Sequence, residues 1–229
     1  MKLPISDRLL ACASFVKRGD RVADIGCDHG YLSIHLLTNG IARSCIASDV
    51  REGPLQSAMR NARKFGVANK IEFFLSDGVQ NIPRDFDCMV CAGMGADTMI
   101  HILESAPWLR ESKYTLILQC QSKAPMLRRY LSENGWQIRA ESALRDGRFL
   151  YTIMEVCYRP ESSALTMGQC YFSPALLENP SADVPAYYKW VVEGLRISTA
   201  HQDDAEKKQV LAELEALAQN PNLSYLTEE

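Results

Sequence analysis

The chain has 229 residues, of which 47% are hydrophobic and 23% are charged, and its formal net charge is −3. This length suits one domain of about 150 residues with an appendage, or two small domains, and excludes a long repeat array. No apolar run approaches the roughly 20 residues of a membrane span. Asp7 and Arg8 interrupt the short apolar stretch near the N-terminus, which disfavours a secretory signal. We therefore predict a soluble, cytoplasmic protein without a membrane segment.

The eight cysteines are scattered as single residues through mostly apolar segments. In a reducing compartment a cysteine packs as a small hydrophobic residue, so we predict free, buried thiols. The pair Cys88 and Cys91 lacks the second pair, of cysteines or histidines, that a tetrahedral zinc site requires. We predict no metal site.

Helices and strands alternate through the first two thirds of the chain. Periodicity predicts, in chain order, a helix at 4–17, a strand at 21–25, a helix at 31–38, a strand at 45–48, a helix at 53–65, strands at 71–75 and 88–92, a helix at 97–105, a strand at 114–119, a helix at 125–134, and strands at 136–144 and 149–157. Ser6 is a suitable N-cap for the first helix. The alternation predicts a mostly parallel, seven-stranded sheet covered by helices on both faces. Asp146-Gly147 predicts an antiparallel hairpin of the last two strands at one edge.

The composition changes near residue 160, and we predict one domain at 1–160 and a second part at 161–229. The first part carries 21 Lys and Arg against 17 Asp and Glu, and the second carries 4 against 11. Residues 162–185 resemble a linker. Apolar residues then recur at helical spacing between 187 and 217, which predicts two antiparallel helices joined by a tight turn. Their apolar stripes can pack on each other, on the first part or on a second subunit, and we favour packing within one chain.

The loop after the first predicted strand is rich in glycine and acids. In an open parallel sheet, ligands bind at the carboxyl ends of the strands, where Asp24, Gly26, Asp28 and Gly30 lie. Gly26 permits a sharp turn and Gly30 permits close packing at the start of the helix. Two carboxylates beside a pyrophosphate would cost several kcal/mol, which disfavours a dinucleotide. S-adenosylmethionine carries an ammonium and a sulfonium and no phosphate, so this loop suits it. The alternative is that both acids only cap backbone amides.

Two further acids end the next two predicted strands. Asp49 is placed to accept the hydroxyl groups of a bound ribose. Asp77 is placed to accept the amino group of an adenine, and Gly78 lets a ring lie against the backbone. Each acid alone is also a common turn residue, but acids at three successive strand ends favour a cofactor site.

The fourth predicted strand ends in Ala92-Gly93-Met94. These residues leave room for a substrate to approach the methyl group, and the backbone of such a loop can orient a planar base. We predict that this loop forms the acceptor side of the site and contributes to cofactor binding.

With these motifs the chain resembles the class I S-adenosylmethionine-dependent methyltransferases, and more narrowly the bacterial tRNA adenine-N1-methyltransferases of the TrmK family, which act on adenosine 22. The likeness lies in Ser6-Asp7-Arg8-Leu9, Ala23-Asp24-Ile25-Gly26-Cys27-Asp28-His29, Tyr31-Leu32, Gly53-Pro54, Asp77-Gly78, Ala92-Gly93-Met94-Gly95, Leu116-Ile117-Leu118-Gln119 and Leu127-Arg128. The resemblance implies a Rossmann-like class I methyltransferase fold followed by a coiled-coil-like helical hairpin. The chain departs from the family pattern at Ala96, Gln121 and Thr152, and Asp49 replaces a glutamate.

The resemblance implies transfer of the sulfonium methyl group to N1 of an adenine in tRNA. N1 is largely unprotonated at neutral pH, so orientation supplies much of the acceleration. Asp28 is the candidate catalytic residue, because a carboxylate stabilises the charge that develops on the methylated ring, and His29 is placed to position it. The alternative is that Asp28 binds only the cofactor and that His29 only caps the helix.

The resemblance also implies contacts with RNA phosphates. Seven basic residues are candidates for these contacts: Arg8, Lys17, Arg18, Arg21, Lys123, Arg128 and Arg129. The expected partner is tRNA, and the expected state is a monomer or a weak homodimer. Two alternatives remain open, namely a class I methyltransferase acting on another RNA, a protein or a small molecule, and a non-catalytic adaptor that binds S-adenosylmethionine.

Overall fold

The computed structural model describes residues 3–178, 180–201 and 203–227. The strands are β1 (Arg21–Ile25), β2 (Ser44–Asp49), β3 (Ile71–Leu75), β4 (Cys88–Gly95), β5 (Thr115–Ser122), β6 (Trp136–Asp146) and β7 (Phe149–Tyr158). The α-helices are α1 (Asp7–Ser14), α2 (Tyr31–Thr38), α3 (Glu52–Lys64), α4 (Ala96–Ser105), α5 (Ala124–Glu133), α6 (Met167–Tyr171), α7 (Ala175–Glu178), α8 (Val184–His201) and α9 (Ala205–Ala218).

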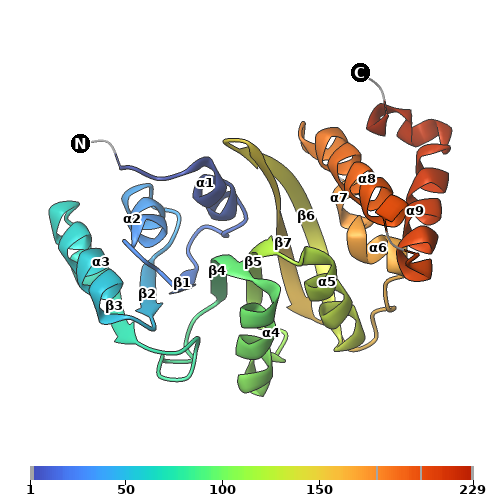
Figure 1. The fold of residues 1–229 in the computed structure, drawn as a ribbon. Helices are drawn as coiled ribbons and strands as arrows, with labels where there is room; N and C mark the ends of the chain where they lie inside the picture. The colour runs from blue at the N-terminus through green and yellow to red at the C-terminus, as the bar shows by residue number, and fades with distance from the viewer. Residues whose placement is uncertain (1–2, 179, 202, 228–229) are drawn as a thin grey trace.

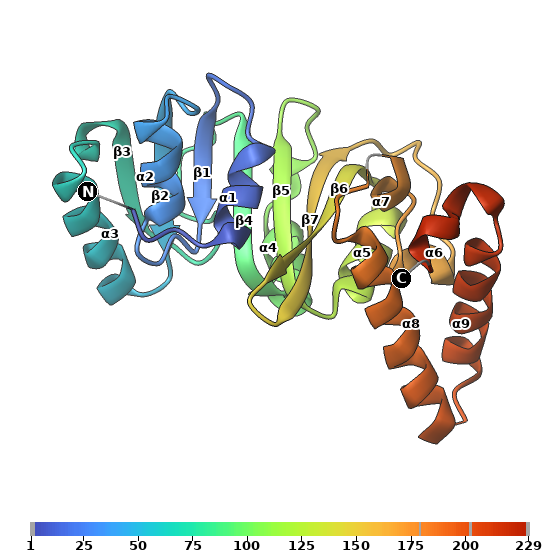
Figure 2. The same ribbon diagram turned by 90° about the horizontal axis from the view of Figure 1, so that it is seen from above.

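The strands form one sheet in the order β3-β2-β1-β4-β5-β7-β6. Of the strands that the structure describes, only β7 runs against the others, because it pairs antiparallel with both β5 and β6. Figure 2 shows α3 at the β3 end of the sheet and α8 and α9 beyond β6 at the other end. The predicted seven-stranded, mostly parallel α/β fold and its edge hairpin are confirmed.

Helices cover both faces of the sheet and enclose two apolar cores (Figure 1). On one face α4 and α5 contribute Met99, Leu103 and Leu127, all at most 1% exposed. On the other face α2 and α3 pack against β1, β2 and β3, and α1 packs against β4, β5 and β6. The first helix begins at residue 7 instead of 4, because the Ser6 hydroxyl accepts a hydrogen bond from the backbone N–H of Leu9 at 3.3 Å and caps the helix there.

All eight cysteines are free and buried, as predicted. Cys91 lies in the core under α4 and α5, and Cys12 and Cys45 lie in the core under α1 to α3. Burial raises the pKa of these three thiols to about 12. The cysteines therefore act as small apolar side chains.

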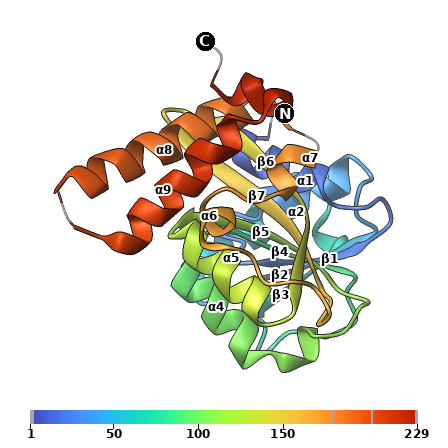
Figure 3. The same cartoon turned by 90° about the vertical axis from the view of Figure 1, so that its right-hand side faces the viewer.

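The segment at 162–185 is more ordered than the predicted linker, because it holds α6 and α7. Helix α6 begins with a capping box in which the Thr166 hydroxyl accepts from the backbone N–H of Gln169 and the Gln169 side chain accepts from the N–H of Thr166. Helices α8 and α9 then lie antiparallel, as predicted (Figure 3). They share a third core that includes Val191 and Leu214 and reaches Ala143 of β6. Their apolar faces pack within one chain.

A buried ion pair joins these C-terminal elements to the sheet. The Arg128 guanidinium of α5 lies 2.6 Å from a carboxylate oxygen of Glu141 on β6, and both side chains are fully buried. Arg128 also donates to the carbonyl of Cys170, the hydroxyl of Thr152 and the hydroxyl of Tyr187. Burial alone would lower the pKa of Arg128, but the Glu141 carboxylate raises it above its ordinary value. The predicted contact of Arg128 with RNA is wrong, because its donors face the interior.

We expect Arg128→Met to lower the free energy of unfolding by about 3–5 kcal/mol, because the Glu141 carboxylate would stay buried without its cation. The matched control is Arg129→Met, which removes an ion pair with Glu206 whose arginine is 40% exposed. We expect that control to lose about 1 kcal/mol or less. Urea unfolding followed by circular dichroism measures both, and equal losses would contradict the assignment.

Candidate cofactor and acceptor site

A cavity of about 370 Å³ opens at the carboxyl ends of β1, β2 and β4. Eight of the residues predicted to bind a cofactor line it: Gly26, Asp28, Asp49, Asp77, Gly78, Ala92, Gly93 and Met94. The sheet topology brings them together, because β1 lies between β2 and β4. An open α/β sheet places its ligand at this position.

Two glycines of the cavity wall have a left-handed backbone conformation, in which a side chain would be strained. Gly26 has a φ of +72°, and a Cβ there would collide with the Cε of Met94. Gly93 has a φ of +81°, and a Cβ there would lie 3.1 Å from an Arg8 nitrogen. Both loops therefore present bare backbone to the cavity, which permits the close approach of a ligand.

The Asp49 carboxylate is held in place by two backbone groups. One oxygen accepts from the N–H of Asp28 at 3.2 Å and the other from the N–H of Arg51 at 2.9 Å. The residue is 6% exposed and lines the cavity. Each oxygen keeps a further lone pair, so the carboxylate can accept from two neighbouring hydroxyl groups.

Asp24 and Gly30 lie outside the cavity lining. The Asp24 carboxylate is buried and accepts from the Ser33 hydroxyl at 2.7 Å. Gly30 starts α2 with a φ of +71°, and a Cβ there would lie 2.9 Å from the Cβ of Ala58, so it allows α2 and α3 to approach closely. This packing role of Gly30 was predicted. Direct contact of either residue with a cofactor stays a prediction.

Asp28 and His29 lie together at the start of α2. Asp28 has a φ of +48°, an uncommon backbone conformation for a residue other than glycine. The His29 Nε2 lies 3.7 Å from an Asp28 carboxylate oxygen, and the imidazole stacks on the Tyr31 ring with the centroids 5.5 Å apart. The 3.7 Å separation is longer than a hydrogen bond, and both the positioning role of His29 and the catalytic role of Asp28 stay predictions.

A buried glutamine links the acceptor loop to the first helix. The Gln119 Oε1 accepts from Arg8 Nη1 at 2.6 Å and from the backbone N–H of Gly93 at 2.9 Å. Gln119 is fully buried at the end of the apolar stretch of β5. No role was predicted for Gln119 from the sequence. The sequence offers one sign of such a role, because this polar residue directly follows the apolar run Leu116-Ile117-Leu118.

The remaining basic residues predicted to contact RNA do not form one surface. Arg8 lines the cavity, and Lys123 lies beyond the end of β5, paired with Asp97 at 2.9 Å. Lys17, Arg18 and Arg21 lie before or at the start of β1, at the opposite end of that strand from the cavity.

The ion pairs of two of these residues restrict them further. Arg21 lies 2.8 Å from Glu72 and 3.4 Å from Asp85, and Arg129 lies 2.7 Å from Glu206. Of the seven candidates, Arg8 lines the cavity, and Lys123 lies two residues after Gln121, which also lines it.

The fold and the acidic cavity at its carboxyl edge define a Rossmann-like enzyme that binds a nucleoside cofactor. Residues 5–154 match the methyltransferase domain family, and the chain belongs to that family. The predicted resemblance is confirmed. In the part of the chain that the structure describes, no helix has the length and apolarity of a membrane span, and no cluster of potential metal ligands occurs.

Several relatives of the chain are tRNA methyltransferases. The chain is 32% identical over 154 residues to the tRNA (adenine(22)-N(1))-methyltransferase of Bacillus subtilis, a match that covers 67% of this chain and 65% of that enzyme. The solved structure of the B. subtilis m1A22 tRNA methyltransferase TrmK matches with a TM-score of 0.77 at 25% identity, over 99% of this chain and 100% of that one. The Streptococcus pneumoniae protein Sp1610 bound to S-adenosyl-L-methionine matches with a TM-score of 0.82 at 32% identity, over 92% and 99% of the two chains.

The buried carboxyl of Asp24 makes stability depend on pH. Burial, with a smaller contribution from Asp49, raises its pKa from 3.8 to about 6, against the hydrogen bond from Ser33. Between pH 4 and 6 the folded state holds a proton that the unfolded state has lost, so this group lowers stability as the pH rises. Relative to wild type, Asp24→Asn should therefore gain roughly 3 kcal/mol between pH 4 and 7. Urea unfolding at several pH values measures the difference, and a constant difference would contradict the shift.

Proposed function

We propose that this chain transfers a methyl group from S-adenosylmethionine to N1 of an adenine in tRNA, at adenosine 22. The observation that carries this proposal is the match to the B. subtilis m1A22 tRNA methyltransferase TrmK over 99% of the chain, since it includes the C-terminal helices as well as the methyltransferase fold. The acidic cavity at the carboxyl edge supports the choice of cofactor.

The residues of the cavity fit S-adenosylmethionine. Asp49 would accept the ribose hydroxyls, and Asp77 would accept the adenine amino group. Gly26 and Asp28 would lie along the methionine part, where the carboxylate of Asp28 suits an ammonium. Arg8 brings a cation that suits the methionine carboxylate. The cavity thus offers a group of opposite charge to both the ammonium and the carboxylate of the methionine part.

When bound, S-adenosylmethionine supplies an electrophilic methyl group on its sulfonium. Adenine N1 is a lone-pair nucleophile at neutral pH, so the chain needs to orient the base and exclude water, without a strong general base. Gly93 and Met94 leave space for the base at the cavity mouth, and Gln119 fixes the loop through the N–H of Gly93. The Asp28 carboxylate stabilises the positive charge that grows on the methylated ring, and the His29 imidazole positions it.

N1 lies on the Watson–Crick edge, so a paired adenine is masked and the target must be unpaired or flipped out. Lys123 would contact a phosphate beside a flipped nucleotide, whereas Arg8 would face the methionine carboxylate inside the cofactor cavity. Contacts within the protein hold both side chains in place, because Arg8 donates to Gln119 and Lys123 pairs with Asp97.

We expect Asp49→Asn to weaken binding of S-adenosylmethionine about 10- to 100-fold, because a charged acceptor of hydrogen bonds is lost. Isothermal titration calorimetry measures the dissociation constant. The matched control is Asp87→Asn. This carboxylate lies at the other end of β1, where it accepts from the backbone N–H of Arg21 and pairs with Arg43. Equal affinity in wild type and Asp49→Asn would remove Asp49 from the cofactor site.

Incubation with labelled S-adenosylmethionine and unmodified tRNA should place label on the tRNA. Nucleoside mass spectrometry should identify 1-methyladenosine, and mapping should place it at position 22. Asp28→Asn should lower kcat about 100-fold, while a role in cofactor binding alone would raise only the KM for S-adenosylmethionine. Saturable cofactor binding without transfer to any tRNA would overturn the proposal and favour another acceptor or an adaptor.

A further inference from the structure

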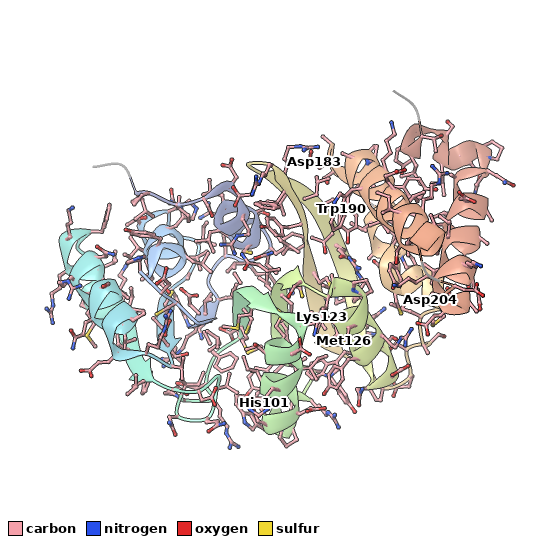
Figure 4. All side chains as sticks on the ribbon, in the orientation of Figure 1. His101, Lys123, Met126, Asp183, Trp190 and Asp204 are labelled. Carbon is pink, nitrogen blue, oxygen red and sulfur yellow. The ribbon has the colours of Figure 1, made fainter. Side chains whose placement is uncertain are left out.

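A second cavity, of about 350 Å³, lies between the sheet and the C-terminal helices. Its walls are the turn between β5 and α5, the beginning of β7, and α8. Four aromatic residues line it, namely Tyr151, Tyr171, Tyr187 and Trp190. Figure 4 labels Trp190 on α8 and Lys123 just ahead of α5. This volume is within the range of pockets that bind small planar ligands.

Trp190 presents a large apolar surface to solvent, since it is 59% exposed. The Tyr187 ring supports it from one side, with the centroids 5.8 Å apart. One turn further along α8 is Gly194, where a Cβ would meet no atom within 4 Å. The helix surface beside the indole is therefore open, and a flat molecule can lie against the ring.

The second cavity adjoins the cofactor cavity. Gln121 lines both cavities. It is followed by Ser122 and by Lys123, whose φ of +60° turns the chain sharply ahead of α5. A ligand in the second cavity would therefore lie close to the acceptor adenine, with Gln121 between the two.

The charged groups at the second cavity favour an anionic ligand with an apolar face. Lys123 and Lys207 line it, and among the described residues of its lining there is no carboxylate. Lys123 pairs with Asp97 at 2.9 Å, and Lys207 with Asp204 at 3.4 Å and with the Ser198 hydroxyl at 2.9 Å. Each ammonium has three donors, so a phosphate can be added to these contacts. Aromatic faces with lysines at the rim are typical of sites for single-stranded nucleic acid.

We infer that this cavity binds an unpaired base of the tRNA that neighbours the acceptor adenine, stacked on Trp190. The inference rests on the proposed function, because tRNA is the substrate that would bring this base. The C-terminal helices would then take part in substrate binding through an aromatic face, although their part of the chain is acidic.

The test compares Trp190→Ala with Ile197→Ala. Both residues are exposed apolar residues of α8, at 59% and 55%, but Ile197 lies outside the cavity lining. Loss of a stacked base should raise the KM for unmodified tRNA about tenfold or more in Trp190→Ala. It should leave the dissociation constant of S-adenosylmethionine unchanged. Ile197→Ala should match wild type, and Trp190→Phe should recover most of the loss. Equal KM values in all four proteins would overturn the inference.

A binding measurement separates this inference from the proposed function. Stacking of a base should quench the emission of Trp190, so titration with unmodified tRNA should quench wild type more than Trp190→Phe. Quenching of this kind without methyl transfer would support the cavity and overturn the proposed function. Equal quenching in both proteins would overturn the inference that the cavity binds a base. Loss of self-association in Trp190→Ala with an unchanged KM for tRNA would also overturn it.

Discussion

The ion pair between Arg128 and Glu141 fixes the C-terminal elements against the sheet. A guanidinium and a carboxylate lose several kcal/mol of hydration each when they are fully buried, and this cost is offset only when nearly every donor finds an acceptor. Arg128 meets that condition by reaching a strand carboxylate, a hydroxyl of β7, a carbonyl of α6 and a hydroxyl of α8. Helix α8 therefore has one position relative to β7. The cavity that contains Trp190 depends on this position, because one of its walls is α8 and another is β7.

The cofactor cavity depends on a different constraint, the order of the strands. Since β1 lies between β2 and β4, the loops that follow these three strands meet at one edge of the sheet. Hydrogen bonds then connect the loops. Asp49 at the end of β2 accepts from the N–H of Asp28 in the loop after β1, and Gln119 of β5 accepts from the N–H of Gly93 near the end of β4. The site is thus preorganised by the backbone, which reduces the entropy lost when a ligand binds.

Local sequence patterns predicted most of the fold because the main elements are consistent with their periodicity. Strand β3 and helix α2 have the predicted bounds, and the Asp146-Gly147 turn joins β6 to β7. The acids and glycines of the cavity were also predictable, since each one lies at or just beyond the carboxyl end of a strand. Residues that act across long sequence distances were not. Arg128 lies in an amphipathic helix, where basic residues are usually solvated, and its partner Glu141 lies on a different element.

The same limit explains two other differences from the predictions. No sequence pattern indicated the hydrogen bond between Arg8 and Gln119, which lie 111 residues apart along the chain. Helices α6 and α7 are too short for a periodic signal, and they are ordered by contacts with α5, α9 and β6. Tertiary packing determines the conformation of such short segments, and no local sequence pattern predicts that packing.

The distribution of the buried cysteines gives each face of the sheet its own chemical reporter. Alkylating reagents attack the thiolate, and burial disfavours that form in the folded state. A thiol reacts only when its own core opens. Modification of Cys91 and Cys120 would therefore record the movement of α4 and α5, whereas modification of Cys12 and Cys45 would record the movement of α1, α2 and α3. Peptide mapping after a pulse of reagent would distinguish local opening of one layer from opening of the whole molecule.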